Sequence, residues 1–247
     1  MSKILDNIRY IITSIDKPLS NINPTQIYNE GWMTRLLVYN SIVEKLVYNE
    51  IDFSKMKNWC SEALISSPFL PRTKSDPLAE GYTHADIALG DFEVDFSYRG
   101  EINLIEPFKV FGIIEAKMGS NLSQGTKNIE NYNQAARNII CIAFNTYKLE
   151  CKIFFGVVAP EKIINKHDIS YQLKKENILS QVIERFNMYD DDFKASVKMD
   201  LIISKINECR IFISSYEEWI NHFDNQDIKK ALNEFYDKSI KWNKIDF

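Results

Sequence analysis

Two charged residues, Glu115 and Lys117, stand at the end of an otherwise apolar run over residues 111–118. Side chains alternate between the two faces of a β-strand, so residues two apart project from the same face. A carboxylate and an ammonium group are therefore expected side by side where a strand ends. A second carboxylate, Asp86, opens another short apolar run that is typical of a neighbouring strand. An Asp followed by Glu-x-Lys indicates a site that handles a metal ion and a water molecule.

A helix is predicted upstream of these residues, where Asn23 and Pro24 form a typical helix start with Asn as the cap and Pro at the first helical position. It is expected to run through about Leu46. Glu30 lies three residues before Met33, which belongs to the apolar stripe of this helix. Glu30 is thus expected to be aimed at the core or its rim.

The remaining elements follow from periodicity and from residues that interrupt it. Apolar runs over 85–89, 92–98 and 108–118, with turns at 90–91 and 99–100, predict an antiparallel meander. The segment 52–76 is interpreted as a short helix followed by a loop. After the meander, the pattern predicts a polar loop over 119–127, a helix over 128–147 and a buried strand over 152–159. Helices over 169–188 and 193–206, a strand over 210–214 and an amphipathic helix from about 227 complete the order.

Composition and charge limit the classes of protein to consider. The 247 residues are enough for one well-buried core, and 45% hydrophobic residues are typical of a globular chain, so a single domain over 1–247 is expected. The formal net charge is −4, from 30 Lys and Arg against 34 Asp and Glu. This balance argues against coating nucleic acid through an overall positive field. A polyanionic partner must instead meet a local patch or a metal ion.

The compartment is predicted to be the cytoplasm. The amphipathic start carries Asp6 within its apolar part, unlike a signal peptide, and no window approaches the ~18 consecutive apolar residues of a membrane span. The 4 cysteines are scattered without a C-x-x-C pair. This spacing predicts reduced thiols rather than disulfides, a zinc site or an iron–sulfur cluster.

The order of elements, with Asp86 on one strand and Glu115-Ala116-Lys117 at the end of a later one, resembles the PD-(D/E)xK nuclease superfamily. The resemblance covers roughly residues 24–159 and lies in the pattern, because Ala85 stands where the motif has Pro. It implies an α/β fold with a restriction-endonuclease-like core, a mixed central sheet flanked by helices. Residues 160–247 are then expected to form C-terminal helical additions specific to a subfamily.

The resemblance also implies a chemistry for these residues. Asp86 and Glu115 would hold Mg²⁺, with Mn²⁺ able to substitute, and Lys117 would orient or help to deprotonate the attacking water. Mg²⁺ favours carboxylate oxygens and keeps positions for water and phosphate oxygens. Its charge stabilises the transition state and lowers the pKa of bound water. A nearby cation is also expected to lower the pKa of Lys117.

Two further residues match positions seen in parts of this superfamily. Glu30 corresponds to a first-helix glutamate that completes the metal site, and a carboxylate at the rim or a loop cap is the alternative. Gln134 corresponds to a glutamine on the helix after Glu-x-Lys. Helical projection places Gln134 opposite the stripe of Ala135, Ala136 and Ile139, so it must act from the edge or the N-terminal end of the helix.

Each of these residues also has a plainer interpretation. A Glu and a Lys two apart on a surface strand commonly form an ion pair. Asp95, in an alternating apolar segment, competes with Asp86 as the second carboxylate, and 101–106, expected to be a turn, offers others. His84 is either a contact to nucleic acid or a structural residue. Arg137 and the polar loop over 119–127 are candidate contacts to a substrate backbone, with a solvated loop as the alternative.

The resulting prediction is a Mg²⁺-dependent phosphodiesterase that cleaves DNA, as a restriction or phage-defence endonuclease. DNA is the expected partner, with a homodimer if both strands are cut, and no small-molecule cofactor beyond the metal ion. The alternatives are a catalytically silent relative that binds nucleic acid or protein, and a DNA-repair or RNA nuclease. Residues that recognise the substrate are expected in 48–80 or beyond 160.

Overall fold

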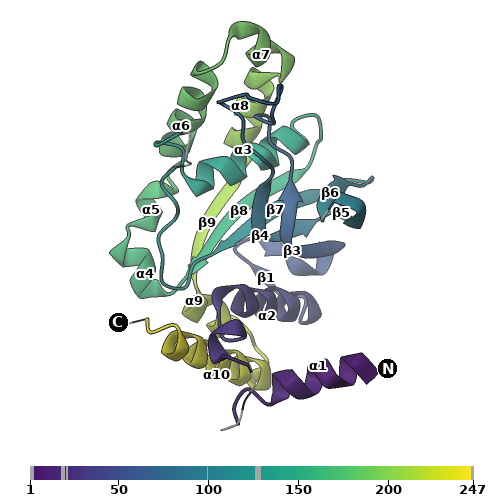
Figure 1. Cartoon of the computed structure of the whole chain (residues 1–247), viewed down its shortest axis with the longest axis vertical. Helices are drawn as coiled ribbons and strands as arrows, with labels where there is room; N and C mark the ends of the chain where they lie inside the picture. Colours follow the sequence, from purple (N-terminus) through teal and green to yellow (C-terminus); the bar gives the residue numbers. More distant parts are fainter. Residues whose placement is uncertain (1–2, 18–19, 21, 99, 126–128, 246–247) are drawn as a thin grey trace.

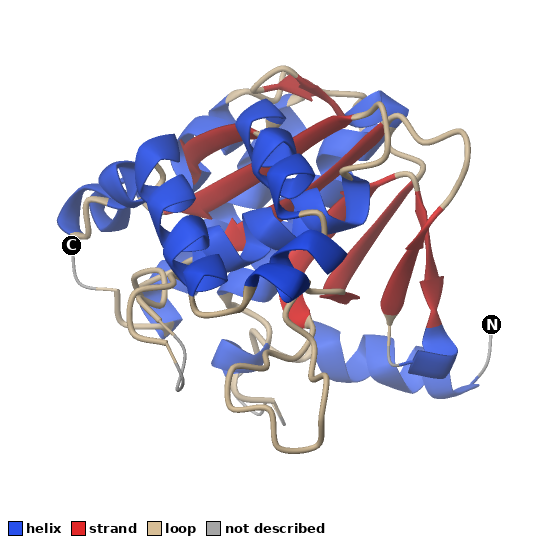
Figure 2. Ribbon diagram, turned by 90° about the horizontal axis from the view of Figure 1, so that it is seen from above, coloured by secondary structure: helices blue, strands red, loops and turns tan. Residues whose placement is uncertain are grey.

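A mixed seven-stranded β-sheet forms the centre of the computed structural model, which describes residues 3–17, 20, 22–98, 100–125 and 129–245. Helices cover both faces of the sheet (Figures 1 and 2). The strand order is β5-β6-β3-β4-β7-β8-β9. The strands are β3 Asn58–Ile65, β4 Thr83–Gly90, β5 Phe92–Asp95, β6 Glu101–Leu104, β7 Val110–Ala116, β8 Lys152–Ala159 and β9 Arg210–Ser215. The predicted α/β class with a mixed central sheet is confirmed.

Side chains of the inner strands alternate between two hydrophobic cores. Ile113 and Phe155 pack on one face with α3 Gln134–Thr146, α6 Lys175–Asn187 and α8 Met199–Glu208. Ile114 and Phe154 pack on the other face with α2 Glu30–Val43, α9 Tyr216–Asn221 and α10 Gln226–Trp242. The buried strand predicted over 152–159 is confirmed as β8, which lies between β7 and β9 and is parallel to both. Glu115 therefore faces the α3 side, as Ile113 does.

The remaining elements are short or peripheral. They are α1 Lys3–Thr13, η1 Pro24–Gln26, β1 Val47–Tyr48, β2 Ile51–Asp52, η2 Phe53–Lys55, η3 Phe96–Tyr98, α4 Glu161–Lys166, α5 Ile169–Gln172 and α7 Asp191–Ser196. In the part of the chain that the structure describes, no helix combines the length and the apolar character that crossing a membrane requires. All four cysteines are free thiols, as the spacing predicted.

The predicted meander is wrong in its pairing. β4 and β7 are antiparallel neighbours, but β5 pairs with β6 at the far edge of the sheet, and β3 lies between them and β4. Strand β3 lies in the segment 52–76, for which a short helix followed by a loop is predicted, so that prediction is wrong here. Its first half is only partly buried and carries Ser61 and Glu62, so it lacks the apolar alternation by which strands are recognised. β6, expected as a turn, supplies Glu101 and its neighbours to the same edge.

Two predicted helix starts are also displaced, because a later Asn takes the capping position. Asn23 caps only the short turn η1, whereas the side chain of Asn29 accepts a hydrogen bond from the N–H of Trp32 and begins α2 at Glu30. The helix expected from 128 begins instead at Gln134, with Asn133 as its cap, and residue 128 itself lies outside the described residues. Both shifts place a candidate site residue at the first position of a helix.

The C-terminal segment contributes to the same sheet. The strand predicted over 210–214 is present as β9, the edge strand beside β8. The helix predicted over 169–188 is divided into α5 and α6, and the one predicted over 193–206 is divided into α7 and α8. The second break falls at Lys198, whose φ of 61° cannot continue a right-handed helix. The amphipathic helix expected from about 227 is confirmed as α10.

Candidate active site

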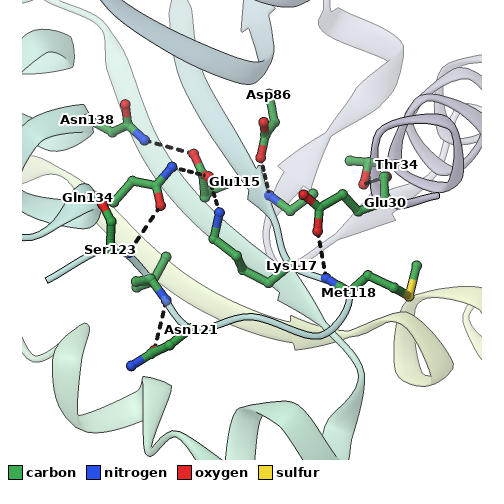
Figure 3. Close-up of polar contacts among 12 residues, drawn as sticks. Glu30, Thr34, Asp86, Glu115, Lys117, Met118, Asn121, Ser123, Gln134 and Asn138 are labelled. Carbon is green, nitrogen blue, oxygen red and sulfur yellow. Dashed lines mark hydrogen bonds and ion pairs between the residues drawn. The ribbon is translucent and has the colours of Figure 1, made fainter. Parts of the chain in front are cut away.

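Glu115 and Lys117 lie side by side where β7 ends, as the two-residue spacing predicted. Lys117 Nζ donates a hydrogen bond to Glu115 Oε1 at 2.7 Å (Figure 3). Both side chains are withdrawn from solvent, Glu115 being 0% exposed and Lys117 8% exposed as residues. The backbone N–H of Lys117 donates to Val158 O at 2.8 Å, so β8 still holds the chain at this point. The pair is therefore buried and fixed, unlike an ion pair on a solvated strand.

Asp86 enters the same site from β4. The paired register of β4 and β7 ends at Ile87 and Ile114, and Asp86 Oδ2 instead accepts a hydrogen bond from the N–H of Ala116 at 2.8 Å. The charge of Asp86 also raises the pKa of the Glu115 carboxyl. The structure thus brings together the carboxylates that the sequence singled out.

Glu30 reaches the site from the opposite side of the sheet. It is the first residue of α2, and its Oε2 accepts a hydrogen bond from the N–H of Met118 at 2.8 Å (Figure 3). Glu30 is half-buried at the rim of the core, and its bond to Met118 is also what the alternative interpretation as a loop cap predicts. The hydrogen bond links the beginning of α2 to the loop that follows Lys117.

Gln134 acts from the N-terminal end of α3, the place that helical projection allowed. Its Nε2 donates to Glu115 Oε1, and its Oε1 accepts from the N–H of Ser123 at 3.4 Å. One turn later, Asn138 Nδ2 donates to Glu115 Oε2 at 3.0 Å, and Thr83 Oγ1 donates to Asn138 Oδ1 at 2.8 Å. The two oxygens of Glu115 are thus held by Lys117 and by two amides of α3.

Asn138 was missed by the sequence analysis, although a signal was present. It follows Gln134 by four residues, and side chains at that spacing share a helix face. Helical projection from Gln134 therefore points to Asn138 as its neighbour. Thr83 offered no comparable signal, because its role depends on how β4 packs against α3.

The electrostatics of the site are dominated by carboxylates held out of water. Burial, and then the charge of Asp86, raise the pKa of Glu115 to about 8, against the opposing effect of Lys117. Burial also raises the pKa of Glu30, and the charges of Asp86 and Glu62 act in the same direction. The site therefore gathers acidic groups where burial disfavours their ionised form.

Lys117 differs from its expected state. Burial lowers its pKa, but the charges of Glu115, Asp86 and Glu30 outweigh that effect and raise the pKa above its ordinary value. The predicted lowering required the charge of a cation, which the protein groups alone do not supply. In the chain by itself, Lys117 is therefore a charged ammonium group among three acidic side chains.

The donor chemistry of this site fits a hard divalent cation, although the ligands are not assembled. Glu30, Asp86 and Glu115 all carry carboxyl groups, whose oxygens are the ligands that such a cation prefers. However, no three His, Cys, Asp or Glu side chains within the described residues are arranged to hold a metal ion. One oxygen each of Glu30 and Asp86 is taken by a backbone N–H, and Glu115 is held by Lys117 and by the amides of Gln134 and Asn138.

The other candidate residues lie apart from these carboxylates or at their margin. Asp95, the competitor of Asp86, ends the edge strand β5 and caps its own turn by accepting from the N–H of Ser97 at 2.9 Å. His84 is exposed on β4. Arg137 lies one turn after Gln134 on the same helix as Asn138, and its guanidinium donates to Ser123 Oγ at 2.8 Å. Of these two acids, Asp86 rather than Asp95 thus lies near Glu115 and Lys117.

A further charged pair lies at the side of Glu30. Glu62 on β3 is within 3.9 Å of the guanidinium of Arg35 on α2. Its charge contributes to the raised pKa of Glu30, so it belongs to the surroundings of the site. Glu62 was not considered from sequence because its strand was not recognised.

Comparison of the chain with family models, with curated proteins and with solved structures finds no match.

Proposed function

We propose that the protein is a metal-dependent phosphodiesterase of the PD-(D/E)xK class, with a restriction-endonuclease-like core, that cleaves DNA. The observation that carries this proposal is the buried ion pair of Lys117 and Glu115 at the end of β7, with the half-buried Asp86 of β4 bonded to the backbone N–H of Ala116 between them. An ion pair on the protein surface contributes little to stability, and it forms without either side chain being buried. Burying an acid beside another acid is costly, and such perturbed groups concentrate at functional sites.

Each residue has a specific task in this reaction. Asp86, Glu115 and Glu30 are the groups that would hold a divalent cation, which supplies positive charge for the phosphate oxygens when bound. Gln134 and Asn138 fix the orientation of the Glu115 carboxylate through their amide hydrogens. Lys117 places an ammonium group beside that carboxylate, where it can orient the attacking water by donating a hydrogen bond.

The test is incubation of purified protein with supercoiled plasmid in Mg²⁺ or Mn²⁺. Nicking or linearisation is expected for the wild type, and loss of it with EDTA and in Lys117→Ala. Lys117→Met keeps the buried stem and separates charge from packing, and Lys152→Ala, an exposed lysine at the start of β8, is the matched control. No cleavage by a folded wild type, or equal cleavage by Lys117→Ala, would contradict the proposal.

A catalytically silent relative that binds nucleic acid is the second candidate. The observation that favours it is that the described acidic residues are not assembled as a cation site. Calorimetric titration with Mn²⁺ separates the two functions, because the enzyme is expected to bind the ion through Asp86 and Glu115 and the silent relative is not. RNA cleavage is distinguished from DNA cleavage by competition between the two substrates.

A further inference from the structure

A polar pocket of about 320 Å³ opens beside the candidate active site, between the loop after β7 and the helices α5 and α6. Most of its lining consists of carboxamide side chains, and we call it the amide pocket: Gln124, Asn131, Asn133, Gln172, Asn177 and Gln181. Tyr171, Ser180 and Glu184 also line it. Its volume is at the lower end of the roughly 300–1,000 Å³ that is common for pockets that bind small ligands. Two larger hollows, of about 720 Å³ each, share no lining residue with the candidate active site.

The amide pocket lies next to the candidate active site, because two of its lining residues directly neighbour residues that belong to the site or contact it. Gln134, which donates to Glu115, directly follows Asn133 of the pocket. The N–H of Gln134 donates to Ser123 O at 2.9 Å, and Ser123 directly precedes Gln124 of the pocket. Figure 3 shows Ser123 beside Gln134, on the side of the site away from Glu30. The pocket is thus one residue away, along both chain segments, from residues that contact the site.

Hydrogen bonds among the amides hold the pocket in shape. Gln172 Nε2 donates to Asn121 Oδ1 at 2.9 Å, and Gln172 Oε1 accepts from Gln124 Nε2 at 2.9 Å. Gln181 Oε1 accepts from the N–H of Asn133 at 2.8 Å, and Asn177 Nδ2 donates to Tyr171 O at 2.8 Å. Each of these contacts fixes an amide plane without requiring a ligand.

Several oxygen and nitrogen atoms of these side-chain amides are available to hydrogen-bond a ligand. Gln124 Oε1, Gln181 Nε2 and Asn177 Oδ1 make no hydrogen bond within the described part of the chain. The pocket thus presents both donors and acceptors on fixed planes. That pattern is complementary to the edge of a nucleobase, and Asn and Gln pair best with adenine, which offers an N–H donor beside a ring-nitrogen acceptor.

The rest of the lining favours a base over a phosphate. Glu184 places a carboxylate in the pocket, which repels phosphate oxygens. Tyr171 is 53% exposed, so its ring offers aromatic surface for stacking, with Lys174 over one face of the ring. Lys174 Nζ lies 4.8 Å from the centre of that ring, where its charge suits the backbone of the same nucleotide.

We propose that the amide pocket binds an unstacked nucleobase, adenine in preference to pyrimidines, from the strand whose backbone lies at the candidate active site. The proposal rests on the proposed function and adds a base preference to it. Extruding a base costs little when the strand is already single. The preference is therefore expected most clearly with single-stranded DNA.

Binding of fluorescein-labelled single strands of ~12 nucleotides to the Lys117→Ala protein in Mg²⁺ tests the proposal. Oligo-dA is expected to bind about tenfold more tightly than oligo-dT or oligo-dC, since one stacked and hydrogen-bonded base is worth about that factor or more. Tyr171→Ala and Asn131→Ala are expected to remove the preference. Tyr39→Ala and Asn187→Ala change the same residue types at exposed positions outside the pocket and are expected to retain it.

Equal binding of the three oligonucleotides would overturn the proposal, and so would a preference that survives in Tyr171→Ala with Asn131→Ala. Plasmid cleavage by the wild type is measured in parallel, so that a failure of the pocket proposal can be told from a failure of the proposed function. Cleavage without a base preference contradicts only the pocket assignment. Absence of both cleavage and DNA binding contradicts the proposed function itself.

Discussion

Glu62 of β3 and Asp86 of β4 occupy matching positions where the pairing of the two strands is interrupted. The ladder pairs Ser61 with Ile87 and Ala63 with Ala85 on either side of them. Glu62 has a φ of 56°, in the left-handed region. On each strand, residues three apart, such as Ala85 and Ala88, consequently face the same core. The interruption turns Asp86 toward the backbone of β7, where it meets Ala116.

The backbone conformation of Glu62 predicts that Glu62→Gly and Glu62→Ala differ in their free energy of unfolding. An L-residue in the left-handed region costs about 1 kcal/mol more than Gly, which has no Cβ. Glu62→Gly is therefore expected to have a free energy of unfolding about 1 kcal/mol higher than Glu62→Ala. Urea unfolding of both variants measures the difference. A Gly variant less stable than the Ala variant would show that the strand does not need this backbone conformation.

The pKa of Glu115 predicts a pH-dependent stability. Its value of about 8 lies above the ordinary 4.5, so between these values the folded chain binds more protons than the unfolded chain. The contribution of the neutral carboxyl is complete below the ordinary pKa and is lost as the pH rises toward the raised one. The free energy of unfolding of metal-free protein is thus expected to fall across this window, and the raised pKa of Glu30 acts in the same direction.

Asp86→Asn tests the part that Asp86 plays in this effect. The amide oxygen of Asn can still accept from Ala116, but the negative charge beside Glu115 is gone. The variant is expected to be more stable than the wild type near ~pH 8 in EDTA and to lose this advantage near ~pH 5, where Glu115 is neutral in both. Urea unfolding at the two pH values is the measurement. An advantage that is equal at both would contradict the like-charge explanation.

Asn138 is expected to affect catalysis through its hydrogen bond to Glu115 rather than by touching the substrate. Asn138→Ala removes the donor to Glu115 Oε2, so the carboxylate loses part of its fixed orientation. Loss of such a supporting hydrogen bond typically costs about 10- to 100-fold in activity or metal affinity. Plasmid cleavage against Mg²⁺ concentration measures both. Asn187→Ala, an exposed Asn on α6, is the control, and wild-type rates in folded Asn138→Ala would refute the role.

Arg185 is predicted to support the segment that leads into β4. Its side chain is 0% exposed, its Nε donates to Glu80 Oε1 at 3.0 Å, and its guanidinium also donates to the hydroxyl of Tyr189 at 3.0 Å. Removing one partner of a buried ion pair costs about 3–5 kcal/mol. Arg185→Met is expected to lower the free energy of unfolding by about that amount.

Glu80→Gln is the gentler variant of the same pair, because its amide oxygen can still accept from Arg185. A smaller loss of stability than in Arg185→Met is expected. Thermal and urea unfolding measure both variants. Equal losses would show that the charge of Glu80, rather than the hydrogen bond, holds the segment.

Local pattern was enough to predict the parts of the site that lie close together in sequence. Glu115 and Lys117 share a face because a strand repeats every two residues, and this requires no knowledge of their neighbours. The apolar run of β8 and the amphipathic pattern of α10 were likewise predictable, since burial on two faces or on one stripe is visible in the letters.

Tertiary structure decided the rest. β3 was unrecognisable because its first half is partly exposed and Glu62 breaks its alternation, so only pairing with β4 makes it a strand. The starts of α2 and α3 depended on which of two nearby Asn residues takes the cap, a choice that packing resolves. The sequence by itself thus determined which side chains could do chemistry. Which of them meet was decided by strand order, because it places Asp86 beside β7 and Asp95 at the far edge of the sheet.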